Sequence, residues 1–155
     1  MTGSSRVSAL LLSFLFLLHL PTFAATHTAA SCSLSAVQAA VNAASNGDTV
    51  LIPNGSCSWN GGISTTKQII IQAQNYTPTS GGSASRNVTI TNNSSSPLFS
   101  LQSGSNYHVG IGGIRFNEGT GNGNAIRFNG SGSKVPLLFD CYFQNKSRFG
   151  SAADV

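Results

Sequence analysis

The carboxylates of the chain are few and lie far apart along the sequence. The four acidic residues are Asp48, Glu118, Asp140 and Asp154. Hydrolysis of a glycosidic bond with inversion requires two carboxyl groups about 6.5 to 9.5 Å apart, on opposite sides of the scissile bond. Asp48 instead follows Gly47 in a turn signal, Glu118 lies in a Gly-rich segment, and Asp154 is next to the last residue. We therefore expect structural or solvated carboxylates, and the sequence assigns no catalytic residue.

Two arginines and one tyrosine are the candidate substrate-binding residues. Arg115 and Arg127 each stand between Ile and Phe in the repeated word Ile-Arg-Phe-Asn. Alternation along a strand places the two apolar side chains inside and the arginine outside. Tyr142 takes the same kind of position between Cys141 and Phe143. Guanidinium groups bind carboxylates, so we predict that these three side chains contact an acidic ligand.

The histidine and metal signals are weak. His108 precedes a strand, but no nearby Ser, Cys or carboxylate motif completes a proton relay, so we expect an exposed or loop-packed histidine. No cysteine has a nearby ligand set for zinc. No acidic cluster forms a calcium cage, and calcium would need carboxylates supplied beyond Val155. Trp59 and Tyr76 are alternative sugar-stacking residues, although for Trp59, close to Cys57, we favour a role in covering the first turn of the fold.

The N-terminus has the layout of a secretory signal peptide. Arg6 is the only charge before the apolar run 9–20, and small residues follow. This run is shorter than the roughly 20 apolar residues that a transmembrane helix needs. Thr22 and Ala24 favour cleavage after Ala24, with cleavage after Ala30 as the alternative. We expect a secreted protein, extracellular or periplasmic, without membrane attachment after cleavage.

The remaining chain is long enough for one domain. We predict a signal peptide over 1–24, a short leader over 25–32, and the N-terminal part of one domain over 33–155. After cleavage, seven Lys+Arg face four Asp+Glu, a net charge of about +3. These cations are dispersed singly, without the basic cluster that nucleic-acid binding requires. A mild positive balance suits an acidic polymer.

The three cysteines divide into a candidate pair and a single thiol. In an oxidising compartment, Cys32 and Cys57 are plausible disulfide partners. Their bond would close a loop of about 25 residues and stabilise the fold by roughly 3 kcal/mol on the chain-entropy estimate. Cys141 stands in the apolar word "LLFDCYF", where we expect it to pack as a small apolar residue.

One short helix and a series of strands are predicted. The apolar stripe at helical spacing is Val37, Ala40, Val41 and Ala44. Ser33 or Ser35 can cap its start and Gly47 its end, which gives a helix over about 33–45. The strand "TVLIP" then follows Asp48, and no helical periodicity returns. Further strand segments are 67–74, 87–93, 97–102, 107–116, 124–128 and 135–143. This spacing alone leaves a β-sandwich, a barrel and a β-solenoid open.

Two aligned segments favour the solenoid. The words "IGGIRFN" and "LFDCYFQ" begin 27 residues apart. The aligned pairs are Ile111 with Leu138, Gly113 with Asp140, Ile114 with Cys141, and Phe116 with Phe143. Their inward residues are the first, fourth and sixth, so strand alternation shifts phase at the third position, Gly113 or Asp140. Both residue types tolerate the left-handed backbone of a structural corner between two strands. Segments 114–116 and 126–128 are then strands of two different sheets in one coil.

The motifs "VQAAVNAASNGDTVLIPNGSC" and "NYHVGIGGIRFNEG…NAIRFNGSG…VPLLFDCYFQN" resemble right-handed parallel β-helix proteins of the pectin lyase-like superfamily. The resemblance covers roughly residues 33–147. It implies an all-β fold, a right-handed parallel β-helix or β-solenoid, with a short N-terminal capping helix and rungs over about 48–147. The superfamily includes polysaccharide lyases, glycoside hydrolases, esterases, phage tailspikes and surface proteins, so the fold alone does not define the activity.

Two functions follow from this resemblance. The first is a polysaccharide-binding or polysaccharide-degrading protein, similar to pectate lyases, with an extracellular and acidic polysaccharide as partner. The alternative is a noncatalytic adhesion or structural β-solenoid. The Asp-Asp and Gly-His-Gly words of the superfamily's hydrolases are absent, so we expect no complete active site here and an inactive segment. Because no capping element follows "FQNKSRFGSAADV", we also expect further rungs, or another chain, to cover the C-terminal end.

Overall fold

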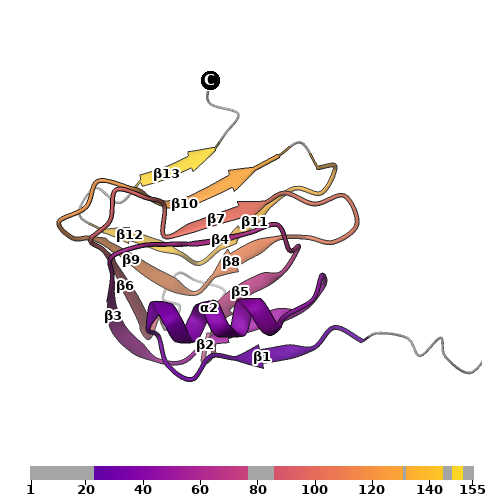
Figure 1. Cartoon of the computed structure of the whole chain (residues 1–155), viewed down its shortest axis with the longest axis horizontal. Helices are drawn as coiled ribbons and strands as arrows, with labels where there is room; N and C mark the ends of the chain where they lie inside the picture. The colour runs from indigo at the N-terminus through magenta and orange to yellow at the C-terminus, as the bar shows by residue number, and fades with distance from the viewer. Residues whose placement is uncertain (1–22, 77–85, 131, 145–147, 152–155) are drawn as a thin grey trace, which may run out of the picture.

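The computed structural model describes residues 23–76, 86–130, 132–144 and 148–151. These residues form three parallel sheets and one short helix, an all-β architecture (Figure 1). Sheet A contains, in spatial order, β1 (Thr26–Thr28), β2 (Thr49–Ile52), β5 (Ile70–Ala73), β8 (Gly110–Gly112) and β11 (Leu137–Phe139). Sheet B contains β3 (Gly55–Trp59), β6 (Val88–Asn92), β9 (Ile114–Glu118) and β12 (Tyr142–Gln144). Sheet C contains β4 (Ile63–Thr65), β7 (Phe99–Gln102), β10 (Asn124–Asn129) and β13 (Arg148–Ser151).

From β2 onward the chain enters sheets A, B and C in a constant order. We call each set of three successive strands a level: β2–β4, β5–β7, β8–β10 and β11–β13. Neighbouring levels pair in parallel, as Figure 1 shows for the stacked arrows of each sheet. Leu138 lies opposite Ile111 in sheet A, and Phe143 lies opposite Phe116 in sheet B. The predicted 27-residue alignment is therefore confirmed, including the separation of the two Ile-Arg-Phe words into sheets B and C.

The core lies between the sheets, and aromatic side chains connect its levels. The ring centroids of Trp59 and Phe99 are 5.2 Å apart. Those of Phe99 and Phe116 are 6.1 Å apart, and Phe143 stacks on Phe116 at 5.3 Å. Such tilted, edge-on and stacked pairs contribute packing energy beyond their buried area. A continuous aromatic column thus connects the first level to the last.

Helix α2 (Leu34–Ala43) packs against β1, β2 and β4 and lies at one end of the stack (Figure 1). Its N-cap is Ser33, whose side chain accepts a hydrogen bond from the Ala36 backbone N–H. At the C-terminal end, Lys67 Nζ donates to the carbonyls of Val41 and Asn42, at 2.9 and 2.6 Å. This ammonium satisfies two carbonyls that have no partner within the helix and complements the helix dipole.

The helix ends earlier than the glycine signal predicts. Ala44 is the C-cap with an extended backbone, and Gly47, with φ +92°, belongs to the turn that follows. The Asp48 carboxylate accepts a hydrogen bond from the Ser45 N–H at 2.7 Å. This side-chain contact offers the backbone an alternative to a further helical turn.

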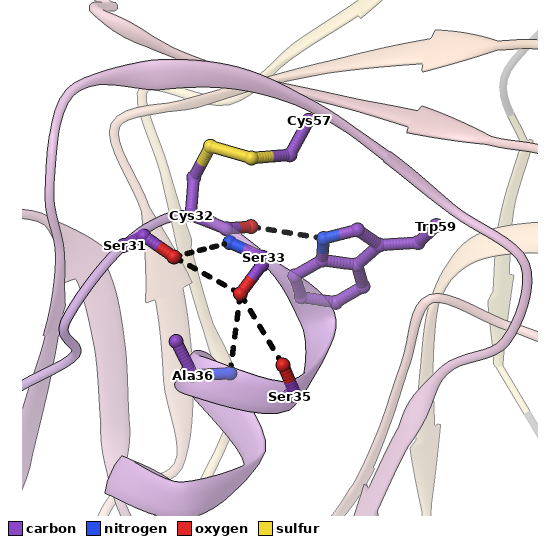
Figure 2. The surroundings of a disulfide bond; sticks show 7 residues. All are labelled: Ser31, Cys32, Ser33, Ser35, Ala36, Cys57 and Trp59. Atoms are coloured by element: carbon purple, nitrogen blue, oxygen red, sulfur yellow. Dashed lines mark hydrogen bonds between the residues drawn. A yellow bond between two sulfur atoms is a disulfide. The ribbon is translucent and has the colours of Figure 1, made fainter.

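A disulfide joins the residue before the helix cap to sheet B (Figure 2). Cys32 and Cys57 are bonded, with their Cα atoms 5.9 Å apart, so the predicted pair is confirmed. Trp59 Nε1 donates to the Cys32 carbonyl at 2.9 Å, and the indole is 1% exposed. Trp59 therefore covers the first level, and its ring has no open face for a sugar.

Some elements lie where the sequence predicts none. Strand β1 occupies part of the expected leader 25–32 and pairs with β2, with Thr26 opposite Thr49. Strands β3 and β4 are short and rich in Ser, Gly and Thr, so their alternation carries little apolar signal. The predicted signal peptide lies, apart from its last residues, outside the described part of the chain. Within the described part, no helix has the length and apolar character to cross a membrane.

Candidate functional site

The outer face of sheet B carries polar side chains in two rows that run across the strands. Alternation buries Val88, Ile90 and their counterparts and turns the intervening residues outward. The first row is Ser56, Thr89, Arg115 and Tyr142. The second row is Ser58, Thr91, Asn117 and Gln144. Because each row is in register, hydroxyl and amide groups repeat at the spacing between strands, about 4.8 Å.

Two guanidinium groups meet one aromatic ring at the upper end of the first row. The Cζ atom of Arg115 lies 5.5 Å from the ring centroid of Tyr142. The Cζ atom of Arg86, which stands just before β6, lies 5.8 Å from the same centroid. Both distances fall within the range of cation–π attraction. Tyr142 remains 46% exposed and Arg115 is exposed, so ring and cation are accessible together.

The corner between sheets A and B holds this cluster in place. Asp140 has φ +47°, and Gly113, one level below, has φ +69°. The Tyr76 hydroxyl donates to the Asp140 carboxylate, and Arg86 Nε donates to the Asp140 backbone carbonyl at 2.8 Å. The Tyr76 ring also packs against Phe139, with centroids 5.6 Å apart. The corner therefore fixes Arg86 relative to the strand that carries Tyr142.

The charge balance at the corner is positive. The hydrogen bond to the Asp140 carboxylate, followed by burial, raises the pKa of Tyr76, so this phenol stays neutral at physiological pH. The Asp140 carboxylate accepts a hydrogen bond from Tyr76, whereas Arg86 donates to the Asp140 backbone carbonyl and not to its carboxylate. The cluster of Arg86, Arg115 and Tyr142, which we call the arginine–tyrosine cluster, has the chemistry to hold an anion beside a ring.

The described residues hold no group of three or more His, Cys, Asp or Glu side chains that could bind a metal ion. Their acidic and basic side chains form one ion pair, His27 with Asp48 at 3.0 Å, beside β1 and β2 rather than on sheet B. Glu118, at the end of β9, is half-buried.

The structure brings together two of the three predicted substrate-binding residues. Arg115 and Tyr142 are direct neighbours in β9 and β12. Arg127 is exposed but lies in β10 of sheet C, opposite Ser100. His108 is exposed, with Nδ1 3.3 Å from the Val135 carbonyl, in agreement with the expectation of a loop-packed histidine.

Arg86 was not predicted from the sequence. The signal that identifies it is the register of β6 with β9, in which Val88 lies opposite Ile114. Extending this alignment by two residues places Arg86 beside Gly112, at the same corner and two levels below Asp140. The predicted corner residues Gly113 and Asp140 both lie between a strand of sheet A and a strand of sheet B.

Comparisons of the chain with protein-family models, with curated protein sequences and with solved structures find no match.

Proposed function

We propose that this chain belongs to a secreted right-handed parallel β-helix protein of the pectin lyase-like kind, and that sheet B binds an acidic extracellular polysaccharide. Three observations support the fold assignment. The chain enters its three parallel sheets in a constant order, a helix lies over the first level, and corner residues recur at matched positions. The "NGDTVLIPNG" opening after that helix is typical of the superfamily.

The arginine–tyrosine cluster carries the functional proposal. An exposed aromatic ring provides an apolar face for a sugar, while a guanidinium group pairs with a uronate carboxylate through two parallel hydrogen bonds. The hydroxyl and amide rows on the same face can exchange hydrogen bonds with sugar hydroxyls along several strands. A linear anionic polymer that lies across the strands fits this pattern.

Binding without turnover is the activity that we propose for the chain described here. The Asp140 carboxylate already accepts a hydrogen bond from Tyr76, and the described residues hold no cluster of three or more His, Cys, Asp or Glu side chains. A lyase or hydrolase activity of a longer parent protein remains a separate prediction. The geometry of sheet B therefore favours a noncatalytic solenoid that displays this binding face.

Affinity measurements with two arginine variants test the proposal. The purified protein is titrated with polygalacturonate and with a neutral galactan of similar length. We expect binding to the acidic polymer only, weakening with salt. Arg115→Ala should weaken it roughly tenfold, the loss of one charged contact.

Arg127→Ala is the matched control, because Arg127 is also an exposed arginine between Ile and Phe but lies in sheet C. It should leave the affinity unchanged. Equal binding of the neutral polymer would remove the acidic specificity. Equal losses in the two variants would mean that sheet B is not the binding face.

A further inference from the structure

Asp48 is a buried carboxylate that accepts hydrogen bonds from two parts of the chain. It is 6% exposed. Its Oδ1 accepts a hydrogen bond from the Ala25 backbone nitrogen at 2.7 Å. Its Oδ2 accepts from the Ser45 N–H at 2.7 Å and lies 3.0 Å from His27 Nε2. The carboxylate thus joins the start of β1 to the turn after helix α2.

The Ala25 nitrogen is also the atom that the predicted cleavage after Ala24 would release. We propose that processing at the Ala24–Ala25 bond converts this nitrogen into an α-ammonium group that pairs with Asp48 and locks β1 onto sheet A. A signal peptidase with water supplies the reaction: the peptide C–N bond breaks, hydroxide joins the Ala24 carbonyl carbon, and the Ala25 nitrogen gains protons to become –NH3⁺.

The site is already built for the charged terminus. Ala25 is positioned by its own carbonyl, which accepts from the Thr49 N–H at 2.8 Å, and by the β1–β2 pairing that follows. An ammonium has three donors and a full charge where the amide has one donor. The present bond at 2.7 Å joins a neutral N–H to a carboxylate, and the ammonium would add a full positive charge opposite that carboxylate. The new positive charge would therefore pair with the Asp48 carboxylate without rearrangement of the site.

The residues on the N-terminal side of the Ala24–Ala25 bond are exposed. Phe23 is 84% exposed, and Ala24 is exposed as well. Both line an open cavity of about 380 Å³ together with Gly47 and Tyr107. Since Phe23 is hardly packed, its removal uncovers little apolar surface elsewhere. Ala24 and Ala25, on the two sides of the scissile bond, both line this cavity.

The structure also distinguishes the two predicted cleavage points. A cut after Ala30 would delete β1 and the residue that follows it, Ala29, which is 3% exposed and donates its N–H to the Leu51 carbonyl at 2.9 Å. It would also remove two of the donors to Asp48 and expose the edge of β2. Only the cut after Ala24 keeps the strand and adds a charge to the network.

The hydrogen bonds from Ser45 and Ala25, and then from His27, hold the pKa of Asp48 below its ordinary value. Asp48 is therefore ionised at every pH at which the protein would be secreted. The titratable groups that face it in the described structure are His27 on β1 and the new α-amine, with the Tyr107 ring beside Gly47. The pairing should persist until the α-amine loses its proton, for which the ordinary pKa is about 8.

The experiment compares two N-termini on one sequence. The secreted protein is analysed by intact mass and N-terminal sequencing, which should give Ala25 as the first residue. Its thermal unfolding is then measured beside that of the same protein acetylated at the α-amine. Acetylation keeps a neutral N–H at Ala25 and removes only the charge. We expect the acetylated form to melt roughly 3 to 6 °C lower at pH 6.5.

The difference should vanish in Asp48→Asn and should remain in Glu118→Gln, a charge-matched control on β9. If Asp48→Asn fails to fold, pH provides the second measurement: pairing with Asp48 raises the pKa of the α-amine above its ordinary value of about 8, so the difference should shrink as the pH rises from 8 and vanish once the paired amine is deprotonated. A mature protein that begins at Ser31 would overturn the proposal. Equal melting temperatures of the free and acetylated forms would overturn it as well.

Discussion

Single residues set the geometry of the corner beside the arginine–tyrosine cluster. Gly113 and Asp140 adopt the left-handed backbone one level apart. A Cβ atom at Gly113 would lie 2.8 Å from the Tyr76 side chain, so that position accepts only glycine without rearrangement. Asp140 tolerates the same conformation through a short polar side chain, and it uses its carboxylate to hold the Tyr76 hydroxyl. Asp140, which satisfies this backbone requirement, thus also anchors the neighbouring Arg86.

Cys141 follows this corner and should be an unreactive thiol. Its sulfur lies 3.7 Å from the Ile111 carbonyl, and burial raises its pKa to about 11. Since the thiolate is the reactive form, alkylation at pH 8 should be roughly a hundredfold slower than that of an unfolded peptide thiol. Iodoacetamide labelling followed by mass spectrometry measures this rate.

The urea-unfolded protein with its disulfide intact is the control, because Cys141 is then the one free thiol of the sequence. The rate in the folded protein should rise steeply only as the pH approaches 11. Labelling that is already fast at pH 8 in the folded protein would show that the thiol is exposed.

At the scale of elements, helix α2 and strand β3 depend on one another. The Cys32–Cys57 bond and the Trp59 indole hold the residues just before the helix against sheet B. Lys67, from the loop between β4 and β5, holds the other end of the helix. A helix of 10 residues is marginal by itself in water. These attachments, together with buried Val37 and Val41, place it over the first level.

Removal of the disulfide should therefore destabilise the protein without changing its fold. Cys32→Ser combined with Cys57→Ser opens a loop with a sequence separation of 25 residues. The expected loss is about 3 kcal/mol in the free energy of unfolding, chiefly because the unfolded chain gains freedom. Urea unfolding followed by circular dichroism measures it.

Cys141→Ser is the control for loss of a thiol outside the disulfide. It should lower the free energy of unfolding by less than the double substitution does. A double variant as stable as the parent protein would contradict the assignment of a stabilising role to this bond.

Elements with strong apolar alternation could be predicted from the sequence, and those without it could not. Strands β6 and β9 alternate buried aliphatic or aromatic residues with polar ones, which is the strand pattern itself. Strand β1, with the sequence Thr-His-Thr, forms because its backbone pairs with β2 and His27 reaches Asp48. Those contacts join residues more than 20 positions apart, so local sequence carries no sign of them.

The candidate site, too, could be predicted from the sequence only in part. Arg115 and Tyr142 could be predicted because strand alternation turns both outward and one repeat aligns them. Arg127 has an identical local pattern, yet the chain carries it into sheet C. Which face an outward residue occupies depends on the order of the sheets, and Arg86 joins the cluster only through the corner at Asp140.

At the scale of the whole molecule, stability passes from level to level. Each strand pairs only with the strands directly above and below it in its own sheet. Stacked repeats of this kind have stabilities that sum local terms and nearest-neighbour interfaces. The aromatic column is one such interface, and Phe116 is its link between the second and fourth levels through Phe99 and Phe143.

Truncation of Phe116 should accordingly loosen the last levels more than the first. Phe116→Ala removes a fully buried ring, a change that typically costs 3–5 kcal/mol, about the range expected here. Amide hydrogen exchange should show the largest loss of protection in β9 and β12, because β9 loses its own ring and Phe143 of β12 loses the ring on which it stacks. Strand β2 stays packed against helix α2, strand β3 stays joined by the disulfide to the residue before the helix cap, and both strands should keep most of their protection.

Val50→Ala provides the opposite case, since Val50 is a buried residue of β2 in the first level. Its loss of protection should centre on β1, β2 and helix α2. If both variants instead lose protection uniformly over all levels, the molecule unfolds as one cooperative unit, and the nearest-neighbour account of its stability is wrong. If each variant loosens its own end, the helix-covered end and the binding face can change in stability separately.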